Sequence, residues 1–161
     1  SETKRPFEMT LHVVPKRVTL GIGCRRGTAY RDLERFVFET LSENDISRKA
    51  VSALHSIELK KTEPCLLQLS ETLGIPFKTF SAEALKALEG CFEGSAFVEK
   101  ITGVDNVCER SALAVAWGED RAQEGTVPAC ASGMSRRLII KKCQKAGMTL
   151  AAAVEDWRCE F

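Results

Sequence analysis

The stretch VTLGIGCRRGT, residues 18–28, decides the fold that this sequence predicts. Its first half is apolar and β-branched, which is typical of a buried strand over 18–22, and it ends in a turn punctuated by glycines. A helix over about 28–42 follows, with Thr28 as its expected N-cap. Its apolar side chains recur at helical spacing, at Leu33, Phe36, Val37 and Leu41. Strand, glycine-rich turn and helix together direct backbone N–H groups and the positive end of a helix toward an anion.

The turn carries its own charge. Arg25 and Arg26 add bidentate donors suited to carboxylate or phosphate. The spacing Gly21, Gly23, Gly27 differs from the dinucleotide fingerprint and from the P-loop, because no Gly-Lys-Ser/Thr follows it. The sequence therefore predicts an anion site without specifying a nucleotide. An alternative stays open, in which the glycines only permit a tight turn and the arginines are solvated.

Composition bounds the class of protein. The chain has 161 residues, of which 44% are hydrophobic and 28% charged, with a net charge of +1. These values indicate one globular domain of ordinary kind. The near-neutral charge argues against a nucleic-acid partner. No apolar run approaches the ~20 residues that span a membrane, so no membrane partner is expected either. Residues 1–16 are polar and basic and are interpreted as a linker, which leaves 17–161 as the domain.

The seven cysteines show no metal-binding or disulfide pattern. No Cys-x-x-Cys pair occurs, and the two histidines, His12 and His55, are far apart in the sequence. We therefore expect no metal site, and reduced thiols in a cytoplasmic protein. The cysteines are Cys24, Cys65, Cys91, Cys108, Cys130, Cys143 and Cys159.

The remaining elements are predicted from apolar spacing, caps and breakers. In chain order they are a short helix over 47–54, a strand over 56–60, a helix from Thr62-Glu63-Pro64 to Gly74, a strand over 76–80, a helix capped by Ser81, a short helix over 95–101, a helix from Asp105 to Gly118, an irregular segment over 119–134, and two strands over 138–141 and 148–154. The last two are too close for a crossover and form an antiparallel hairpin. The predicted fold is α/β, with a mainly parallel sheet and a C-terminal antiparallel hairpin. Small side chains at Ala112, Ala114 and Ala116 would let their helix approach that sheet closely.

Ligands of such sheets bind beyond the carboxyl ends of the strands. Three predicted strand ends meet there, at 21–28, 60–63 and 79–81. They bring Lys60, Lys61 and Glu63 toward the arginines of the turn. The alternative for the two lysines is that they only solvate the rim of the sheet.

Five motifs in a fixed order resemble one family. They are GIGCRRGT at 21–28, Lys60 with Glu63-Pro64, FSAEAL at 80–85, TGV at 102–104 followed by VCE at 107–109, and GMTLA at 147–151. This pattern resembles the C-terminal domain of the cobalamin-biosynthesis family CbiG, the cobalt-precorrin-5A hydrolases, which is related to CobE. The resemblance covers about residues 18–155. It implies a three-layer α/β/α sandwich, and an enzyme of anaerobic cobalamin synthesis that opens the δ-lactone of cobalt-precorrin-5A and releases acetaldehyde, giving cobalt-precorrin-5B. Residues 1–16 would then join this domain to further N-terminal domains.

The resemblance also implies a ligand and its contacts. The ligand is a cobalt corrinoid fringed with acetate and propionate carboxylates, and no separate cofactor is expected because the substrate carries the cobalt. The residues expected to bind it are Gly21, Gly23, Arg25, Arg26, Gly27, Thr28, Lys60, Glu63, Ser81, Thr102 and Gly103.

Lactone opening needs a general base and stabilisation of an oxyanion. Glu109 is the candidate base, and backbone N–H groups of 23–27 are candidate oxyanion donors. Cys24 is a rival nucleophile, since a helix N-terminus and neighbouring arginines lower a thiol pKa. The alternatives are a structural thiol at Cys24 and a charge at Glu109 that favours the helix dipole. The whole chain has two alternatives too: a non-catalytic corrinoid-binding or partner-docking module that meets other corrin-pathway enzymes, and an unrelated phosphate-binding α/β domain.

Overall fold

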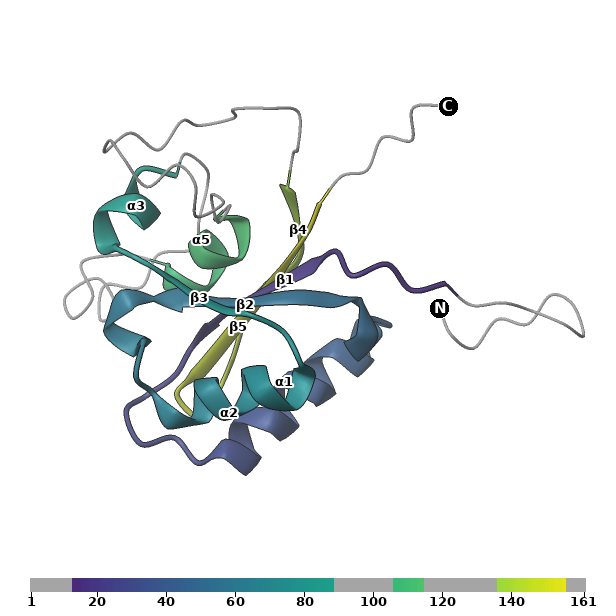
Figure 1. Cartoon of the computed structure of the whole chain (residues 1–161), viewed down its shortest axis with the longest axis horizontal. Helices are drawn as coiled ribbons and strands as arrows, with labels where there is room; N and C mark the ends of the chain where they lie inside the picture. The colour runs from purple at the N-terminus through teal and green to yellow at the C-terminus, as the bar shows by residue number, and fades with distance from the viewer. Residues whose placement is uncertain (1–12, 89–105, 115–135, 156–161) are drawn as a thin grey trace, which may run out of the picture.

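The computed structural model describes residues 13–88, 106–114 and 136–155, and these form a five-stranded sheet with helices on both faces (Figure 1). The sheet order is β3-β2-β1-β5-β4. The strands are β1 (Val18–Gly23), β2 (Val51–Ile57), β3 (Phe77–Phe80), β4 (Arg136–Lys145) and β5 (Met148–Glu155). The helices are α1 (Tyr30–Glu43), α2 (Pro64–Leu73), α3 (Ala82–Lys86) and α5 (Val107–Leu113), with 3₁₀ turns η1 (Arg48–Ala50) and η2 (Glu58–Lys60).

Strand directions follow the predicted plan. β2 pairs parallel with both β1 and β3, whereas β5 pairs antiparallel with both β1 and β4. Four strands therefore point one way and β5 points the other way. The predicted hairpin of β4 and β5 is confirmed, and so is its place beside a parallel sheet. One consequence matters for the site: β4 ends at the same edge of the sheet as β1.

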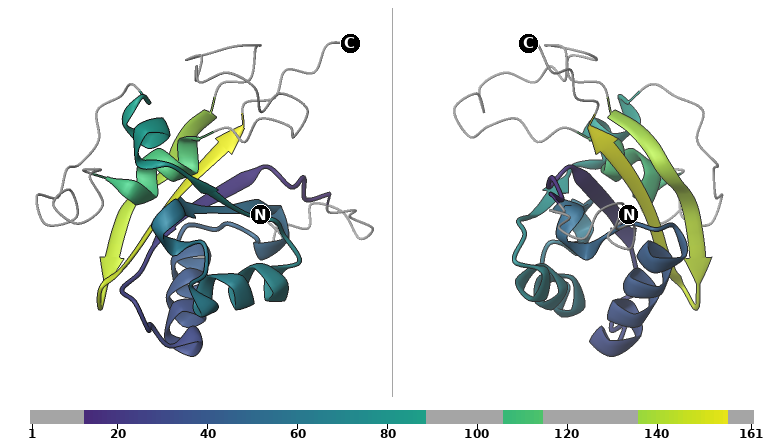
Figure 2. Two further views of the ribbon diagram at one scale, coloured as in Figure 1. Left: turned by 60° about the vertical axis from the view of Figure 1, so that its left-hand side comes forward. Right: turned by 90° about the vertical axis from the view of Figure 1, so that its right-hand side faces the viewer.

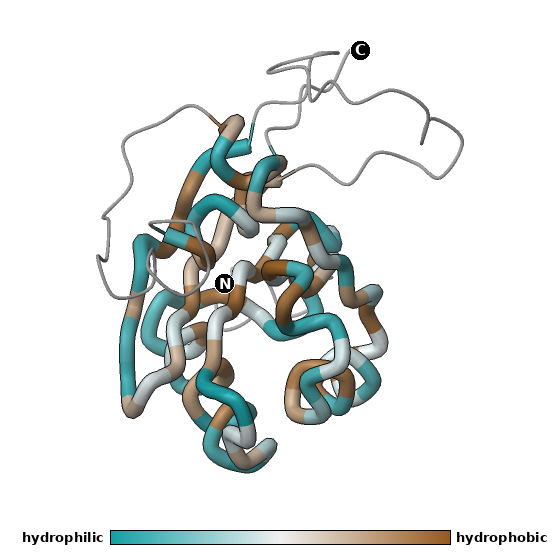
Figure 3. The backbone as a smooth tube through the Cα atoms, turned by 90° about the vertical axis from the view of Figure 1, so that its left-hand side faces the viewer, coloured by the Kyte–Doolittle hydropathy of each residue, from teal (hydrophilic) through white to brown (hydrophobic). Residues whose placement is uncertain are grey.

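The helices make the outer layers of a three-layer α/β/α sandwich. α1 and α2 cover one face of the sheet, and α3 and α5 cover the other (Figures 1 and 2). On the first face, Leu20 and Ile22 of β1 pack with Leu33 and Val37 of α1 in the main apolar core. Apolar and hydrophilic stretches alternate along the chain, as the burial of one side of each helix requires (Figure 3). The predicted layered fold is confirmed.

The second face depends on close approach between α5 and β1. A Cβ atom placed on Gly21 would lie 1.8 Å from the carbonyl oxygen of Cys108 and 2.6 Å from the backbone nitrogen of Ala112. Glycine is therefore the residue that lets the helix backbone reach the sheet. Of the small side chains expected on this helix, Ala112 fits this packing, since it is buried with Ala151 and Ala153 of β5. Ala114 is buried but lies just after α5, and Ala116 lies outside the described residues.

The prediction for 47–60 was wrong in detail. The expected helix over 47–54 is only the short turn η1, which Ser47 caps by accepting from the N–H of Lys49. β2 instead begins at Val51, and the residues expected at the end of that strand form η2. The strand lies between β1 and β3 and is buried on both faces, so its sequence lacks the alternation that marks a half-buried strand.

Two predicted helix caps were also wrong. The hydroxyl of Thr28 donates to the carbonyl of Arg25 at 2.7 Å, and α1 begins after Ala29 without a side-chain cap. Asn106 caps α5 by accepting from the N–H of Glu109 at 3.1 Å, one residue after the expected Asp105.

Other boundaries follow the sequence more closely. Ser81 caps α3 as expected, and Gly74 ends α2 with a φ of 61°. β4 is longer than the expected 138–141, and α5 ends at Leu113, short of the expected Gly118. The helix expected over 95–101 and the irregular segment over 119–134 lie outside the described residues.

Candidate functional site: an anion pocket at the carboxyl edge of the sheet

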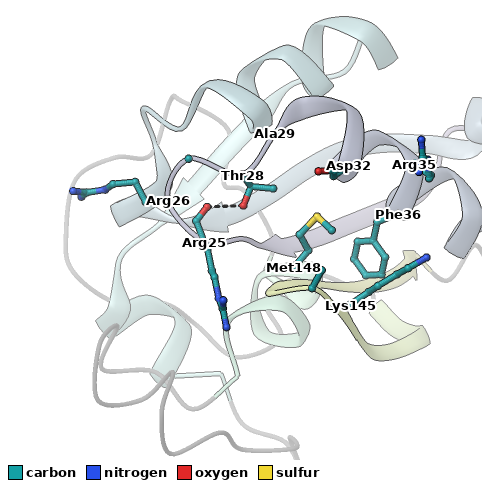
Figure 4. A pocket seen from close by; sticks show the side chains of 11 residues that line it. Arg25, Arg26, Thr28, Ala29, Asp32, Arg35, Phe36, Lys145 and Met148 are labelled. Atoms are coloured by element: carbon teal, nitrogen blue, oxygen red, sulfur yellow. Dashed lines mark hydrogen bonds between the residues drawn. The ribbon is translucent and has the colours of Figure 1, made fainter.

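The carboxyl ends of β1 and β4 enclose an open pocket of about 340 Å³ between the glycine turn, α1 and the β4–β5 turn (Figure 4). Among the described residues that line it, four side chains are cationic and one is a carboxylate, so this part of the pocket favours an anion. The lining residues are Arg25, Arg26, Gly27, Thr28, Ala29, Asp32, Arg35, Phe36, Lys145, Ala146 and Met148.

The floor of this pocket is apolar. Phe36 is 5% exposed and Met148 is 4% exposed, and both belong to the main core. A close-packed core holds such side chains in fixed positions. The pocket therefore combines a rigid apolar floor with charged walls.

The two arginines of the turn do not converge. Arg26 points away from the other labelled side chains, whereas Arg25 turns toward the β4–β5 end (Figure 4). A Cβ atom on Gly147 would lie 2.5 Å from Nε of Arg25, so this glycine leaves space for the arginine side chain. With a φ of 79°, Gly147 also adopts a conformation that other residues rarely take. The hairpin turn thus supports Arg25.

Glu63 holds the glycine turn from the neighbouring strand end. Its Oε1 accepts from the backbone N–H of Gly27 at 2.9 Å, and its Oε2 lies 3.4 Å from Nζ of Lys60. The carboxylate is buried, with the residue 7% exposed. The N–H of Gly27, expected as an oxyanion donor, is therefore already paired. Glu63 and Lys60 fix the shape of the turn, while Lys61 stays exposed on the rim.

The environment of Cys24 is the opposite of the one expected for a nucleophile. Burial, followed by the neighbouring Cys65 thiol, raises the pKa of Cys24 to about 12, and Lys60 counteracts this only weakly. The two sulfur atoms are 3.8 Å apart. Desolvation outweighs the nearby positive charges, so the argument for a nucleophile at Cys24 loses its basis. The structure fits the alternative of a structural thiol.

The four cysteines that the structure describes are free: Cys24, Cys65, Cys108 and Cys143. No group of three or more His, Cys, Asp or Glu side chains in the described segments is arranged to hold a metal ion.

Glu109 lies inside the molecule and does not line the pocket. It is 2% exposed. Its Oε2 accepts from the side-chain amide of Asn106 at 2.8 Å, and its Oε1 accepts from the backbone N–H of Lys142 at 2.7 Å. The register of β4 is irregular between Ile140 and Cys143, and Lys142 lies within this irregularity. Glu109 therefore binds α5 to the edge strand where the regular ladder is interrupted.

The other predicted site residues divide among three places. Gly21 is covered by α5, and a Cβ atom on Gly23 would lie 2.6 Å from Oγ1 of Thr149. Ser81 lines a second hollow of about 370 Å³ at the ends of β2 and β3, with Glu58 and Glu83 on its walls. Thr102 and Gly103 lie outside the described residues. Of the residues predicted to bind the ligand, Arg25, Arg26, Gly27 and Thr28 line the first pocket.

The sequence analysis missed the opposite wall of this pocket. Asp32, Arg35 and Lys145 carry its charge, and Phe36 and Met148 form its floor. The predicted hairpin supplied only half of the signal for Lys145, because the pairing of β5 with β1, which the sequence does not show, is what returns β4 to the direction of β1. The turn after β4 must then lie at the same edge as the glycine turn.

The chain is a three-layer α/β domain with a cationic pocket beyond the carboxyl ends of its strands, which is where domains of this class bind their ligands. The family model described as "Cobalamin synthesis G C-terminus" matches residues 18–153, and the chain belongs to this family. The resemblance noted in the sequence is confirmed.

Relatives and solved structures agree with this assignment. Cobalt-precorrin-5A hydrolase of Salmonella typhimurium is 42% identical over 107 residues, which are 66% of this chain and 30% of that protein. The hydrolase of Priestia megaterium is 37% identical over 99 residues, 62% of this chain and 26% of that protein. The chain thus spans less than a third of either relative.

Among solved structures, the cobalamin-pathway protein CobE superposes with a TM-score of 0.71 at 29% identity, covering 93% of this chain and 99% of that one. A cobalamin biosynthesis protein G homologue from Sulfolobus solfataricus shares the fold, with a TM-score of 0.59 at 18% identity over 88% of this chain and 38% of that one. No helix among the described residues is both long and apolar enough to cross a membrane.

Proposed function

We propose that this chain is the C-terminal domain of a cobalt-precorrin-5A hydrolase, and that it binds the carboxylate-fringed corrinoid substrate at the edge pocket. The observation that carries the proposal is the excess of cationic side chains around this pocket in a chain of this family. The names of the two curated relatives support the choice of substrate. We place this activity in the cytoplasm.

The size of the pocket limits what it can hold. Ligand pockets commonly measure about 300–1,000 Å³, and this one is at the lower end of that range. It therefore suits the periphery of a corrinoid and leaves the macrocycle outside, over the rim. Each charge-assisted hydrogen bond to a carboxylate contributes about 1.5–3 kcal/mol, less where the site stays open to water.

The two candidate catalytic residues, Glu109 and Cys24, fit the requirements of lactone opening less well than the pocket fits the substrate. Lactone opening needs a base that can take a proton from water. Both carboxylate oxygens of Glu109 already accept hydrogen bonds, and the thiol of Cys24 is buried. These two observations favour a second function, a corrinoid-binding module that completes its site with other parts of the enzyme or docks on other corrin-pathway enzymes.

A titration tests the binding proposal. Cobyrinic acid, a stable corrinoid with free carboxylate side chains, is added to the chain while its visible absorption is followed. Saturable spectral change is expected, and its absence would overturn the proposal. Incubation with cobalt-precorrin-5A then separates the two functions, because release of acetaldehyde by the chain alone requires catalysis and binding without release indicates the module.

A further inference from the structure

The wall of the pocket formed by α1 and the hairpin turn supplies a lysine that is held by an exposed ion pair, a feature that the glycine turn lacks. Lys145, the last residue of β4, lines the pocket together with Arg35 of α1. Nζ of Lys145 lies 2.8 Å from Oε2 of Glu39, and the two side chains are 61% and 47% exposed. This hydrogen bond from Lys145 is the main reason that the pKa of Glu39 is lowered. Exposed ion pairs contribute little stability, so an incoming anion can displace Glu39.

The backbone holds Lys145 at the rim. Only two residues, Ala146 and Gly147, separate β4 from β5, with φ values of 50° and 79°. Two left-handed residues in succession are the signature of a tight primed hairpin turn, where Asn or Gly is usual at the first position. Ala146 accepts this unfavourable conformation and lines the pocket with a small side chain. The base of the Lys145 side chain therefore starts from a fixed position.

The floor next to this lysine is apolar. Phe36 and Met148 line the pocket with the small part of each side chain that the core leaves uncovered, and this apolar part can contact methylene groups. An inorganic anion would use only the charged walls. A side chain with an apolar stem and an anionic tip would use both parts of the pocket.

Asp32 is the one carboxylate among the described residues that line the pocket, and it makes the two ends of the pocket differ in charge. Asp32 lies in the first turn of α1, between the glycine turn and Arg35 in the sequence. A ligand carboxylate is repelled at this point and favoured nearer Arg35 and Lys145. In Figure 4, Lys145 and Phe36 lie on the side of the pocket away from Arg26.

From these observations we infer that the pocket is a subsite for one carboxyalkyl side chain of the corrinoid. Its stem packs on Phe36 and Met148, and its carboxylate binds Lys145 in place of Glu39. The inference rests on the proposed function and adds to it a residue, Lys145, that distinguishes a carboxylate from an amide at this position.

The test compares Lys145→Met with Lys141→Met in the same strand, since Lys141 is exposed and does not line the pocket. The probes are cobyrinic acid and the same corrinoid with its side chains amidated. Lys145→Met should weaken binding of the carboxylate probe at least tenfold and leave binding of the amidated probe unchanged. Lys141→Met should change either affinity less than twofold, and Glu39→Gln should strengthen carboxylate binding about twofold by releasing Lys145.

The outcomes separate the subsite from the function. If the native chain binds cobyrinic acid and the two lysine variants are equally affected, the subsite is wrong and the proposed function stands. If the native chain binds neither corrinoid, both fall. Urea denaturation should show equal stability for the two lysine variants, so that a loss of binding by Lys145→Met cannot come from unfolding.

Discussion

The sequence predicts ligand-binding charges at the glycine turn and a catalytic base at the start of α5, but the structure exposes the charges of the turn and buries the charge of α5. The turn leaves Arg25 and Arg26 exposed at an open pocket. The start of α5 instead encloses Glu109, and every acceptor oxygen of this carboxylate has a donor from the protein. The exposed arginines of the turn can therefore bind a ligand, whereas the carboxylate of Glu109 under α5 is fully engaged in hydrogen bonds that hold the fold together.

The comparison shows how to assign a charged residue whose sequence position suits two roles. A buried charge must be paired and hydrogen-bonded, or its desolvation is not compensated. Once these bonds are accounted for, the groups left over are the ones that can act on a substrate. Both oxygens of Glu109 are paired, so the charged groups still able to meet a substrate are those of the pocket between α1 and the hairpin.

The largest effect should come from filling the close contact under α5. Gly21→Ala puts a methyl group against the backbone of Cys108, which cannot move without lifting the helix. We expect a loss of about 3 kcal/mol in the free energy of unfolding, at the upper end for overpacking. Gly74→Ala is the control, because its φ is positive but open space surrounds it, and about 1 kcal/mol is expected there. Urea denaturation measures both, and equal losses would contradict the close packing.

The second effect is pH-dependent and comes from His55, also under α5. Its Nδ1 lies 2.9 Å from the carbonyl of Ser111, so Nδ1 carries the proton of a neutral ring. Burial lowers the pKa of His55 to about 4, because desolvation outweighs the opposing effect of the hydrogen bond to the Ser111 carbonyl. The unfolded chain therefore binds more protons at mildly acidic pH, so stability present above about pH 6.5 is lost as the pH falls toward 4.

This loss should reach about 2–3 kcal/mol and then level off. Denaturation in urea at several pH values measures it. His55→Gln keeps a donor for the Ser111 carbonyl and removes the titrating ring. The variant should lose most of the pH dependence in this range, and an unchanged dependence would show that other groups cause it.

A smaller effect is expected from Glu109→Gln. The new amide group would point a donor at the N–H of Lys142 or at the amide of Asn106. One buried donor is then left unsatisfied, which costs about 2 kcal/mol. Glu83→Gln, an exposed change in α3, should cost less than about 0.5 kcal/mol. If Glu109→Gln leaves stability unchanged and abolishes acetaldehyde release, the catalytic hypothesis for Glu109 is restored.

The smallest effect on stability belongs to the arginines of the turn. Replacing both Arg25 and Arg26 by Ala should lower the free energy of unfolding by less than about 1 kcal/mol for each arginine, because exposed charges contribute little to stability. The same variant should weaken binding of cobyrinic acid by about 2 kcal/mol and flatten its salt dependence. Lysine at both positions should restore only part of this, since an ammonium lacks the planar fork. A double variant that unfolds would make these arginines structural.

Local pattern determined much of this protein. Spacing and caps that need no partner predict the strand, glycine turn and helix over 18–43 and the hairpin near the end of the chain. They also predict that one helix ends at Gly74 and that the next begins after Ser81. The order of five short motifs was enough to identify the family. The arginines of the turn were found for the same reason, because a polar residue beyond a strand end is visible in one short window.

Only the tertiary structure decided what depends on which segments meet. The sequence of β2 shows no alternation of apolar and polar residues, because helices cover both faces of the sheet at this central strand. The raised pKa of Cys24 depends first on burial and then on the thiol of Cys65, which is 41 residues away in the sequence. The pairing of Glu109 depends on an irregularity in β4, and the second wall of the pocket depends on strand direction. Burial and hydrogen-bond partners are properties of contacts distant in sequence, so they become fixed only when the chain is folded.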